Sequence, residues 1–277
     1  MGVKHREFTA AGIGGIDLYA QGWLPEVTAR GVIVVAHGLA EHGGRYEALA
    51  GELVQRGYAV YALDHRGHGR SPGPRANIDR FTHLVSDFCA FTGRCARQHL
   101  DTPVFMLGHS MGGAIAFASA LRVQHTLRGL ILSAPALATN QTLPAIQEML
   151  VRLLSIVAPG KGALTLPADA VSRDPDVVAR YVADPLVHHK AIPARTLVEL
   201  LGAMKGFPAQ ASQLKLPTLV LHGTADKLVP LAATKPVYQV LGTRDRTLKF
   251  YDGLYHEVFN EPEREKVTAD LIRWLER

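Results

Sequence analysis

Short apolar runs that end in Gly, His or Asp recur along the chain, and most are followed by a stretch with helical periodicity. This alternation is typical of parallel strands joined by crossover helices. The runs hold few polar residues, as expected of strands buried on both faces of a sheet. Such strands are predicted at Gly31–Gly38, Ala59–Asp64, Val104–Ser110, Gly129–Ala134, Thr218–Gly223 and Leu248–Tyr251.

The segment before these runs has a different pattern. Between Phe8 and Leu24, two alternating segments flank Gly12, Gly14 and Gly15, which predicts an antiparallel hairpin at an edge of the sheet. Together with the buried runs, this hairpin gives a mixed, mostly parallel sheet of about eight strands, flanked by helices.

The interval from Pro135 to Pro217 is roughly twice as long as the other intervals between predicted strands, and we expect no strand in it. Pro208 is expected to help mark its far boundary. We therefore predict a helical cap at residues 138–212, inserted into a core made of residues 1–137 and 213–277. Helices of the cap are predicted at Ala145–Val157, Asp176–Val182 and Ala194–Met204.

Composition narrows the classes of protein. The 277 residues are 47% hydrophobic and 20% charged, the balance of a globular protein with a sizeable core. The net charge of +5 is spread singly along the chain, so we expect no nucleic-acid partner. Cys89 and Cys95 lie in a predicted helix and are interpreted as core or helix-face thiols. No apolar stretch is long enough to span a bilayer or to serve as a signal sequence, so a cytoplasmic location is expected.

A candidate nucleophile lies in Gly108-His109-Ser110-Met111-Gly112, a G-x-S-x-G sequence between a predicted strand and the helix-like segment AIAFASALRV. This context matches a nucleophile elbow, in which glycines on both sides let the backbone turn sharply and raise the serine hydroxyl above the sheet. The N-terminus of the following helix favours negative charge at this position.

A serine hydroxyl needs a base within hydrogen-bond reach and a carboxylate that orients the base. Asp226 and His256 follow later predicted strands and give the order Ser, Asp, His that this arrangement requires. Asp252 is a competing acid, but it lies too near His256 in sequence. Negative charge on the substrate oxygen needs two donors, which we assign to the backbone N–H groups of Leu39 and Met111.

Seven ordered segments, which span nearly the whole chain, resemble the monoacylglycerol lipases of the α/β-hydrolase superfamily, particularly the bacterial ones. They are HGLAEHGGRY, ALDHRGHGRSPGPR, GHSMGG, SRDP, YVADPL, HGTADKLVP and YHEVFNEPE. The resemblance implies an α/β-hydrolase fold with a lid-like cap, hydrolysis of monoacylglycerols to fatty acid and glycerol, and no metal or organic cofactor. It also implies that Glu41, Arg45, His109 and Tyr181 shape or contact the glycerol end. Alternatively, Glu41 and Arg45 only pair with each other and order their loop, and Tyr181 is a core residue of the cap.

Two questions of function stay open at this level. The triad does not select its ester, so a carboxylesterase or a lysophospholipase is the alternative activity, and a ligand-binding protein on the same scaffold is the alternative class. The apolar run within Ala145–Val157 exceeds what one packed helix face needs. It is expected to line an acyl channel, to contact a lipid surface as a peripheral membrane element, or to pack against other cap helices. Oligomeric state is not predicted.

Overall fold

Apolar runs of five or six residues form the centre of the fold. The computed structural model describes residues 2–139 and 145–277. Every residue is buried in the strands β3 (Gly31–Ala36), β4 (Tyr58–Leu63), β5 (Val104–His109), β6 (Gly129–Ser133) and β9 (Thr218–Gly223). Burial on both faces explains why these segments carry no alternation of polar residues.

These strands belong to a sheet of eight within the described residues, completed by β1 (Val3–Ala11), β2 (Asp17–Pro25) and β10 (Arg246–Tyr251). The order is β1-β2-β4-β3-β5-β6-β9-β10. The pairs β1–β2 and β2–β4 are antiparallel and the others are parallel, which confirms the predicted mixed sheet with a hairpin at one edge. β1 begins at Val3, before the predicted start at Phe8. The earlier start was not predicted, because the first residues of β1 are exposed and give no burial pattern.

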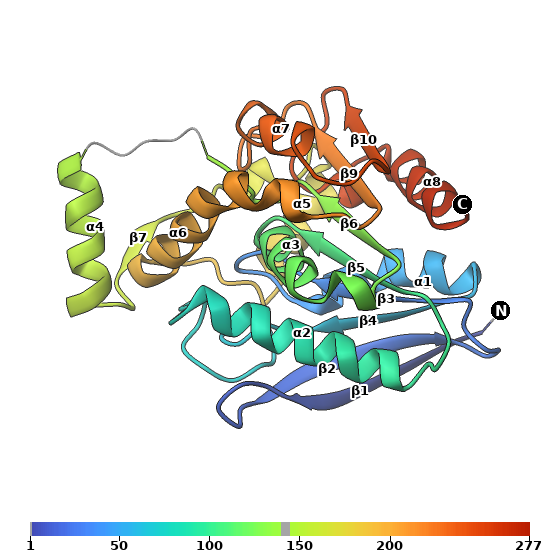
Figure 1. Cartoon of the computed structure of the whole chain (residues 1–277). Coiled ribbons are helices and arrows are strands. Elements are labelled where there is room, and N and C mark those ends of the chain that lie inside the picture. Colours follow the sequence, from blue (N-terminus) through green and yellow to red (C-terminus); the bar gives the residue numbers. More distant parts are fainter. Residues whose placement is uncertain (1, 140–144) are drawn as a thin grey trace.

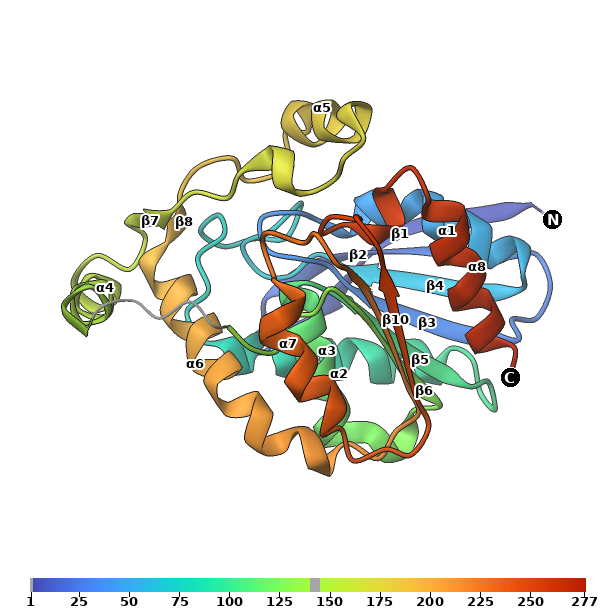
Figure 2. The ribbon, with the colours of Figure 1, turned by 90° about the horizontal axis from the view of Figure 1, so that it is seen from above.

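Helices cover both faces of the sheet, as Figures 1 and 2 show. On one face, α2 (Phe81–Arg97), α3 (Met111–Val123) and α7 (Leu231–Gln239) pack against the sheet through one apolar cluster. On the other face, α1 (Glu47–Gln55) and α8 (Arg264–Leu275) pack through a second cluster. Buried apolar side chains on both sides hold the strands in place, and the loops at their ends are free to carry polar groups.

The segment between β6 and β9 contains α4 (Ala145–Val157), α5 (Pro175–Ala183) and α6 (Ala194–Gln210), close to the three predicted helices. Two expectations for this segment are wrong. A two-stranded sheet of β7 (Gly162–Leu164) and β8 (Ile192–Pro193) is present, too short to leave a periodic signal. Helix α6 continues through Pro208 instead of ending before it. Residues 140–144 of the predicted cap lie outside the described residues.

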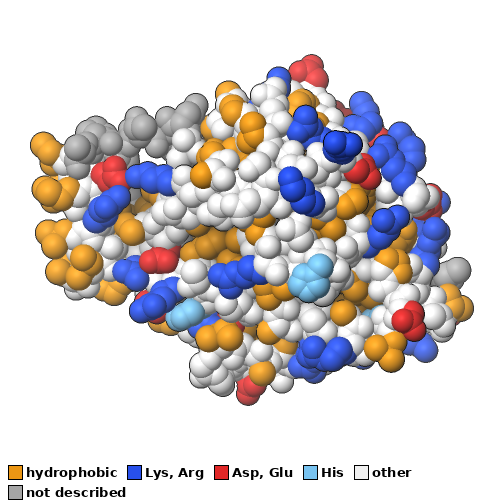
Figure 3. Space-filling view, viewed as in Figure 1, with side chains coloured by type: hydrophobic (Ala, Val, Ile, Leu, Met, Phe, Trp, Pro, Cys, Tyr) orange, Lys and Arg blue, Asp and Glu red, His pale blue; other side chains and the backbone are white. Residues whose placement is uncertain are grey.

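Helix α4 lies away from the sheet and exposes most of its apolar side chains, which gather at the left edge of Figure 3. The side chains of Leu150 and Leu153 are each 54% exposed, whereas Ser155 is buried. The most exposed apolar members are Ile146, Met149, Leu150, Leu153, Ile156 and Val157. The expectation that this run packs against other helices is therefore wrong for most of its residues. In the part of the chain that the structure describes, no helix has the length and apolar character needed to cross a membrane.

Candidate active site

Loops that follow parallel strands meet at the same edge of the sheet, and four of them carry the residues singled out from the sequence. Leu39 follows β3, Ser110 follows β5, Asp226 follows β9 and His256 follows β10. The intervening strand β6 pairs with both β5 and β9, so the loops lie side by side at the carboxyl ends of their strands. Open α/β sheets form their ligand sites at this edge.

Ser110 occupies a sharp turn between β5 and α3. Its backbone has φ 54° and ψ −122°, a strained conformation for a residue with a side chain. The glycines on either side are required by close approach. A Cβ atom on Gly108 would lie 2.3 Å from the carbonyl oxygen of Gly112, and one on Gly112 would lie 2.0 Å from that of Ala36. The glycines therefore allow helix α3 to begin directly after Ser110, against the end of β3.

Asp226 and His256 form a buried pair. Asp226 Oδ2 lies 2.7 Å from His256 Nδ1 and 3.2 Å from His222 Nε2, and Oδ1 accepts hydrogen bonds from the backbone N–H groups of Leu228 and Val229. Burial opposes ionisation of Asp226, but the attraction of His256 and the hydrogen bond from His222 outweigh it and lower the pKa of the carboxyl well below its ordinary value. The pair therefore holds a carboxylate directly behind the imidazole.

The environment of His256 favours its protonated form. Burial alone would lower the pKa of its imidazole, but the neighbouring carboxylates, Asp226 above all, raise the pKa above its ordinary value. His109 stands against it, with ring centroids 4.6 Å apart. Burial, with the nearby charge of His256, lowers the pKa of His109 to about 4. The two imidazoles thus differ in charge preference: His256 can take up a proton near neutral pH, and His109 stays neutral.

Ser110 makes no side-chain hydrogen bond with His256 in this structure, although both residues line the same cavity. Such contacts are often long without substrate and tighten when the site is occupied. Leu39 and Met111 line the cavity as well, and their backbone N–H groups make no hydrogen bond within the described residues. Two backbone donors without a partner among the described residues therefore belong to residues that line the same cavity as Ser110.

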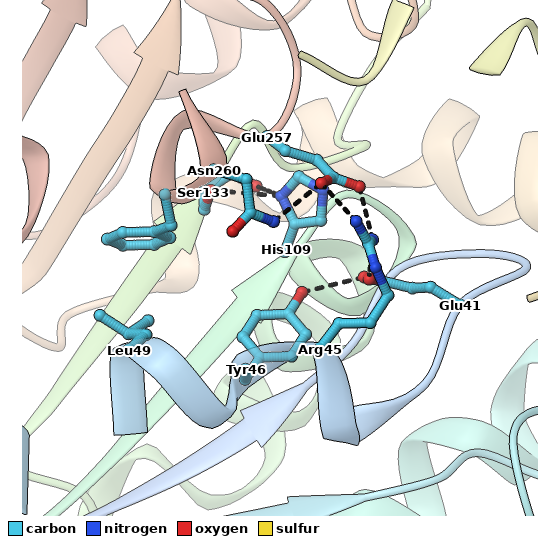
Figure 4. A pocket seen from close by; sticks show the side chains of 9 residues that line it. Glu41, Arg45, Tyr46, Leu49, His109, Ser133, Glu257 and Asn260 are labelled. Atoms are coloured by element: carbon cyan, nitrogen blue, oxygen red, sulfur yellow. Dashed lines mark hydrogen bonds and ion pairs between the residues drawn. The ribbon is translucent and has the colours of Figure 1, made fainter. Parts of the chain in front are cut away.

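A buried ion cluster adjoins the cavity, shown in Figure 4. Arg45 Nη1 lies 2.6 Å from Glu41 Oε2 and 2.6 Å from Glu257 Oε1, and Arg45 Nη2 donates to Glu257 Oε2 at 2.7 Å. Glu41 Oε1 also accepts from the backbone N–H of Gly38 at 2.5 Å and from the Tyr46 hydroxyl at 2.9 Å. Glu41 and Arg45 therefore pair, but not only with each other, since Arg45 also binds Glu257 and Glu41 also lines the cavity.

Tyr181 connects this cluster to α5. Its ring packs with Val171 and Val187, and the Arg45 guanidinium carbon lies 4.8 Å from its centroid, the distance of a cation–π contact. Tyr181 also lines the cavity that contains Ser110. It is therefore both a core residue of the segment between β6 and β9 and a wall of the cavity.

The cavity itself has about 1030 Å³ of free space, including its open mouth. Ser110, His256, His109, Glu41 and Glu257 are among its lining residues, whereas Arg45 lines a smaller pocket of about 350 Å³ that shares Glu41, His109 and Glu257 with it. Most of the remaining wall is apolar and comes from β7, α6 and nearby loops: Leu164, Leu166, Leu197, Leu200, Leu201 and Met204. Among the described residues of α4 none lines the cavity, so the expectation that its apolar run forms the channel is wrong.

Sequence reasoning missed Glu257, the second carboxylate partner of Arg45. The residue follows His256 directly, inside the segment YHEVFNEPE, so its position was visible. The partner of Glu257 could not be identified from the sequence, because Arg45 lies 212 positions earlier in the chain. A glutamate next to a candidate base is the only signal that sequence offers for it.

Comparison with known proteins extends these observations. A profile of the family described as serine aminopeptidase, S33, matches residues 27–263. The chain is 43% identical over 269 residues to a monoacylglycerol lipase of Mycolicibacterium smegmatis, with 97% of this chain and 96% of the relative covered. It is 32% identical over 264 residues to the monoglyceride lipase of Homo sapiens, with 94% of this chain and 87% of the relative covered.

A solved structure agrees with the same assignment. The crystal structure of the Paleococcus ferrophilus monoacylglycerol lipase matches with a TM-score of 0.80 and 31% sequence identity. The match covers 99% of this chain and 98% of that one. The similarity therefore extends over the sheet, the flanking helices and the segment between β6 and β9.

Proposed function

The chain belongs to the monoacylglycerol lipase family of the α/β-hydrolase superfamily, as its motifs predicted, and we propose on this premise that it hydrolyses monoacylglycerols to a fatty acid and glycerol. The observation that carries the proposal is the buried Asp226–His256 pair, whose histidine lines the same largely apolar cavity as Ser110. This arrangement combines a serine hydroxyl, a base that can activate it and space for a long acyl chain.

In the proposed reaction, Ser110 Oγ attacks the ester carbonyl while His256 Nε2 accepts its proton. The tetrahedral oxyanion receives hydrogen bonds from the N–H groups of Leu39 and Met111, each worth about 3 to 4 kcal/mol. The ester C–O bond then breaks, and His256 returns the proton to the glycerol oxygen. Water, deprotonated by His256 in turn, then attacks the acyl carbon of the acyl-Ser110 intermediate. The bond from this carbon to Ser110 Oγ breaks, His256 returns the proton to Ser110 Oγ, and the fatty acid leaves. Because Ser110 and His256 are not hydrogen-bonded here, their contact has to tighten as substrate fills the cavity.

Asp226 has the orienting role. It fixes the protonated nitrogen of His256 at Nδ1, leaving Nε2 free toward the cavity. A carboxylate of lowered pKa remains ionised throughout the working pH range and stabilises the imidazolium that forms during each step.

We assign residues 138–212 as the cap and residues 1–137 and 213–277 as the core. The supporting observation is that leucines of β7 and α6 and the cap residue Tyr181 line the same cavity as Ser110. An acyl chain of about sixteen carbons would gain roughly 12 kcal/mol from leaving water for such a wall. At the polar end, His109 and Tyr181 are assigned to contact the glycerol moiety. Glu41 and Arg45 are assigned to shape the site that binds the glycerol moiety, because their charges are already paired with each other.

The first experiment tests the nucleophile. A fluorophosphonate probe should label the folded wild-type protein and should fail to label Ser110→Ala. Ser119→Ala is the matched control, because Ser119 is a fully buried serine of the same helix that lies outside the cavity. Absence of labelling in the folded wild-type protein would overturn the proposal and favour a ligand-binding protein on the same scaffold.

A second experiment tests the substrate. Fatty-acid release should be fastest with monoacylglycerols and slow with di- and triacylglycerols, as expected of the lipase family to which the chain belongs. Faster release from lysophospholipids or from short-chain esters would replace the monoacylglycerol assignment by a lysophospholipase or a carboxylesterase.

We further propose that α4 contacts a lipid surface, where monoacylglycerols reside. Its support is the row of exposed apolar side chains on this helix. Wild-type protein should co-sediment with vesicles of phosphatidylcholine and phosphatidylglycerol, and the Leu150→Ser/Leu153→Ser variant should bind about tenfold or more weakly. Leu100→Ser is the control, since Leu100 is 79% exposed but lies outside α4. Equal binding by all three proteins would remove the proposal.

A further inference from the structure

We propose that Glu257 is a positioning residue for ester hydrolysis, which acts through Arg45 to hold the loop of His256 against the loop that carries the Leu39 N–H. This inference rests on the function proposed above. Glu257 touches neither of the reacting groups through its own hydrogen bonds, and its effect on them passes through the ion cluster of Figure 4.

The first half of the connection is the contact between Glu257 and Arg45. Both carboxylate oxygens of Glu257 accept hydrogen bonds from the guanidinium, at 2.6 and 2.7 Å, in the bidentate geometry that fixes direction as well as distance. Asn260 Nδ2 donates to Glu257 Oε2 at 2.8 Å, so the carboxylate cannot rotate freely. Since Glu257 directly follows His256, a fixed Glu257 restrains the backbone that carries the imidazole.

The second half of the connection consists of the hydrogen bonds that join Arg45 to the loop after β3. Arg45 Nη1 also donates to Glu41 Oε2, and Glu41 Oε1 accepts the backbone N–H of Gly38. Gly38 directly precedes Leu39, whose N–H is a proposed oxyanion donor. One guanidinium therefore spans the two loops that must hold the base and the donor at a fixed separation.

The backbone of Glu257 adds a contact with the cap. Its N–H donates to the carbonyl oxygen of Val171 at 2.8 Å, and Tyr181 covers Arg45 from the same segment. The two glutamates border the cavity but are almost fully buried: Glu41 and Glu257 are 4% and 6% exposed. At this degree of burial an ion pair is little screened by water, and losing one partner leaves a charge without compensation.

The charges of the cluster also act on His256. The titratable groups near it are Asp226 after β9, His109 at the end of β5, Glu41 after β3, and Glu257 beside it; Arg45 is ion-paired to both glutamates. Burial lowers the pKa of His256 and Asp226 raises it, and Glu257 and Glu41 raise it further. Because two carboxylates share one guanidinium, the cluster keeps a net negative charge that favours the imidazolium.

Glu257→Gln tests this inference because it nearly preserves shape, removes the charge and replaces one acceptor by a donor. The acid limb of the kcat/KM profile on p-nitrophenyl butyrate should move to lower pH by about half a unit or more. The plateau value of kcat should fall about 10- to 100-fold with little change in KM, because the base and the oxyanion donor lose their common anchor. A purely structural role would lower thermal stability without moving the acid limb.

Glu257→Asp separates charge from geometry and serves as well if the glutamine variant does not fold. It should keep the acid limb at the wild-type pH and retain a kcat between those of the wild type and Glu257→Gln. Asp270→Asn is the matched control: Asp270 is 8% exposed and paired with Lys249 and Arg273, away from the cavity, so neither the limb nor kcat should change.

Two outcomes distinguish the failures. A folded wild-type protein that hydrolyses no ester would remove the proposed function. An active wild-type protein whose Glu257→Gln and Glu257→Asp variants both retain the wild-type kcat and acid limb would overturn the inference alone.

Discussion

Gly112 lies where helix α3 approaches the end of strand β3, and a single added methyl group should disturb the catalytic geometry. A Cβ atom on Gly112 would stand 2.0 Å from the carbonyl oxygen of Ala36 and 2.4 Å from that of His37. Real Cβ atoms come no closer than about 3.0 Å to such atoms. Gly112→Ala therefore forces the start of α3 away from β3 by about 1 Å.

This displacement separates the two proposed oxyanion donors, because Met111 moves with α3 and Leu39 moves with the loop after β3. A misplacement of about 1 Å at a catalytic centre lowers the rate by about 100-fold. Added volume at a close-packed contact costs about 1 to 3 kcal/mol of unfolding free energy. Gly112→Ala should thus lose about two orders of magnitude in kcat while it remains folded.

The assay is the hydrolysis of p-nitrophenyl butyrate, with active protein counted by fluorophosphonate labelling and folding followed by thermal unfolding. Gly51→Ala is the matched control, since Gly51 lies within α1 and an added Cβ would meet nothing within 4 Å. That variant should keep its kcat and gain up to about 1 kcal/mol of stability, because alanine favours helix more than glycine does. If Gly112→Ala keeps kcat within about twofold of the wild type, the placement of α3 does not control the oxyanion donors.

Three further predictions follow from the same geometry. Asp226→Asn should lower kcat by about 10⁴-fold, because an amide no longer fixes the useful tautomer of His256. Circular dichroism checks that the variant is folded, and a loss of kcat below about tenfold would contradict the orienting role of Asp226. The kcat/KM of the wild type should rise with pH and reach half of its plateau above pH 6.5, the ordinary pKa of histidine. The base must be neutral to accept a proton, and the pKa of His256 is raised above the ordinary value. A midpoint below pH 6.5 in a pH–rate profile would contradict this prediction. Arg66→Met should lower the unfolding free energy by about 3 kcal/mol, because it leaves the buried Asp87 carboxylate without its cation; thermal unfolding measures the loss, and kcat should not change.

The parts of the fold that could be predicted from sequence are those where burial is uniform along an element. The central strands β3 and β5 are buried at every residue, and each appears in the sequence as an unbroken apolar run. Helix α4 was predicted to the residue, because apolar positions recur along it with few interruptions. Its surroundings were not predicted, since a pattern of apolar side chains does not say whether protein, lipid or solvent covers them.

Elements whose stability comes from tertiary contacts escaped the sequence pattern. Strands β7 and β8 have three and two residues, too few for a period of two to be recognised. Helix α6 contains Pro208 in its last turn, where a proline removes one hydrogen bond. The neighbouring Phe207 is buried against Phe81 of α2 and Phe117 of α3, a tertiary contact that offsets the loss in a helix that continues to Gln210.

The candidate site also contains residues that the sequence pattern could predict and residues that it could not. Ser110, Asp226 and His256 could be proposed because each follows a recognisable strand, and parallel strands bring such positions to one edge. The pairing of Arg45 with Glu257 depends instead on two loops, 212 positions apart, that approach over the edge of the sheet. Neither loop has a periodicity that specifies how far it reaches.

The sign of the charge at the site shows why local pairing matters more than composition. The chain as a whole carries a net charge of +5, yet the cluster around His256 holds the carboxylates of Asp226, Glu41 and Glu257 against the single guanidinium of Arg45. An excess of buried acid destabilises a neutral imidazole relative to its cation, and the cation is the form that develops as Ser110 loses its proton. The positive charges that dominate the composition lie mostly on the exposed surface, where water and salt screen them from the reaction. A basic chain can therefore maintain an acidic catalytic environment, provided that its carboxylates are the charges that become buried.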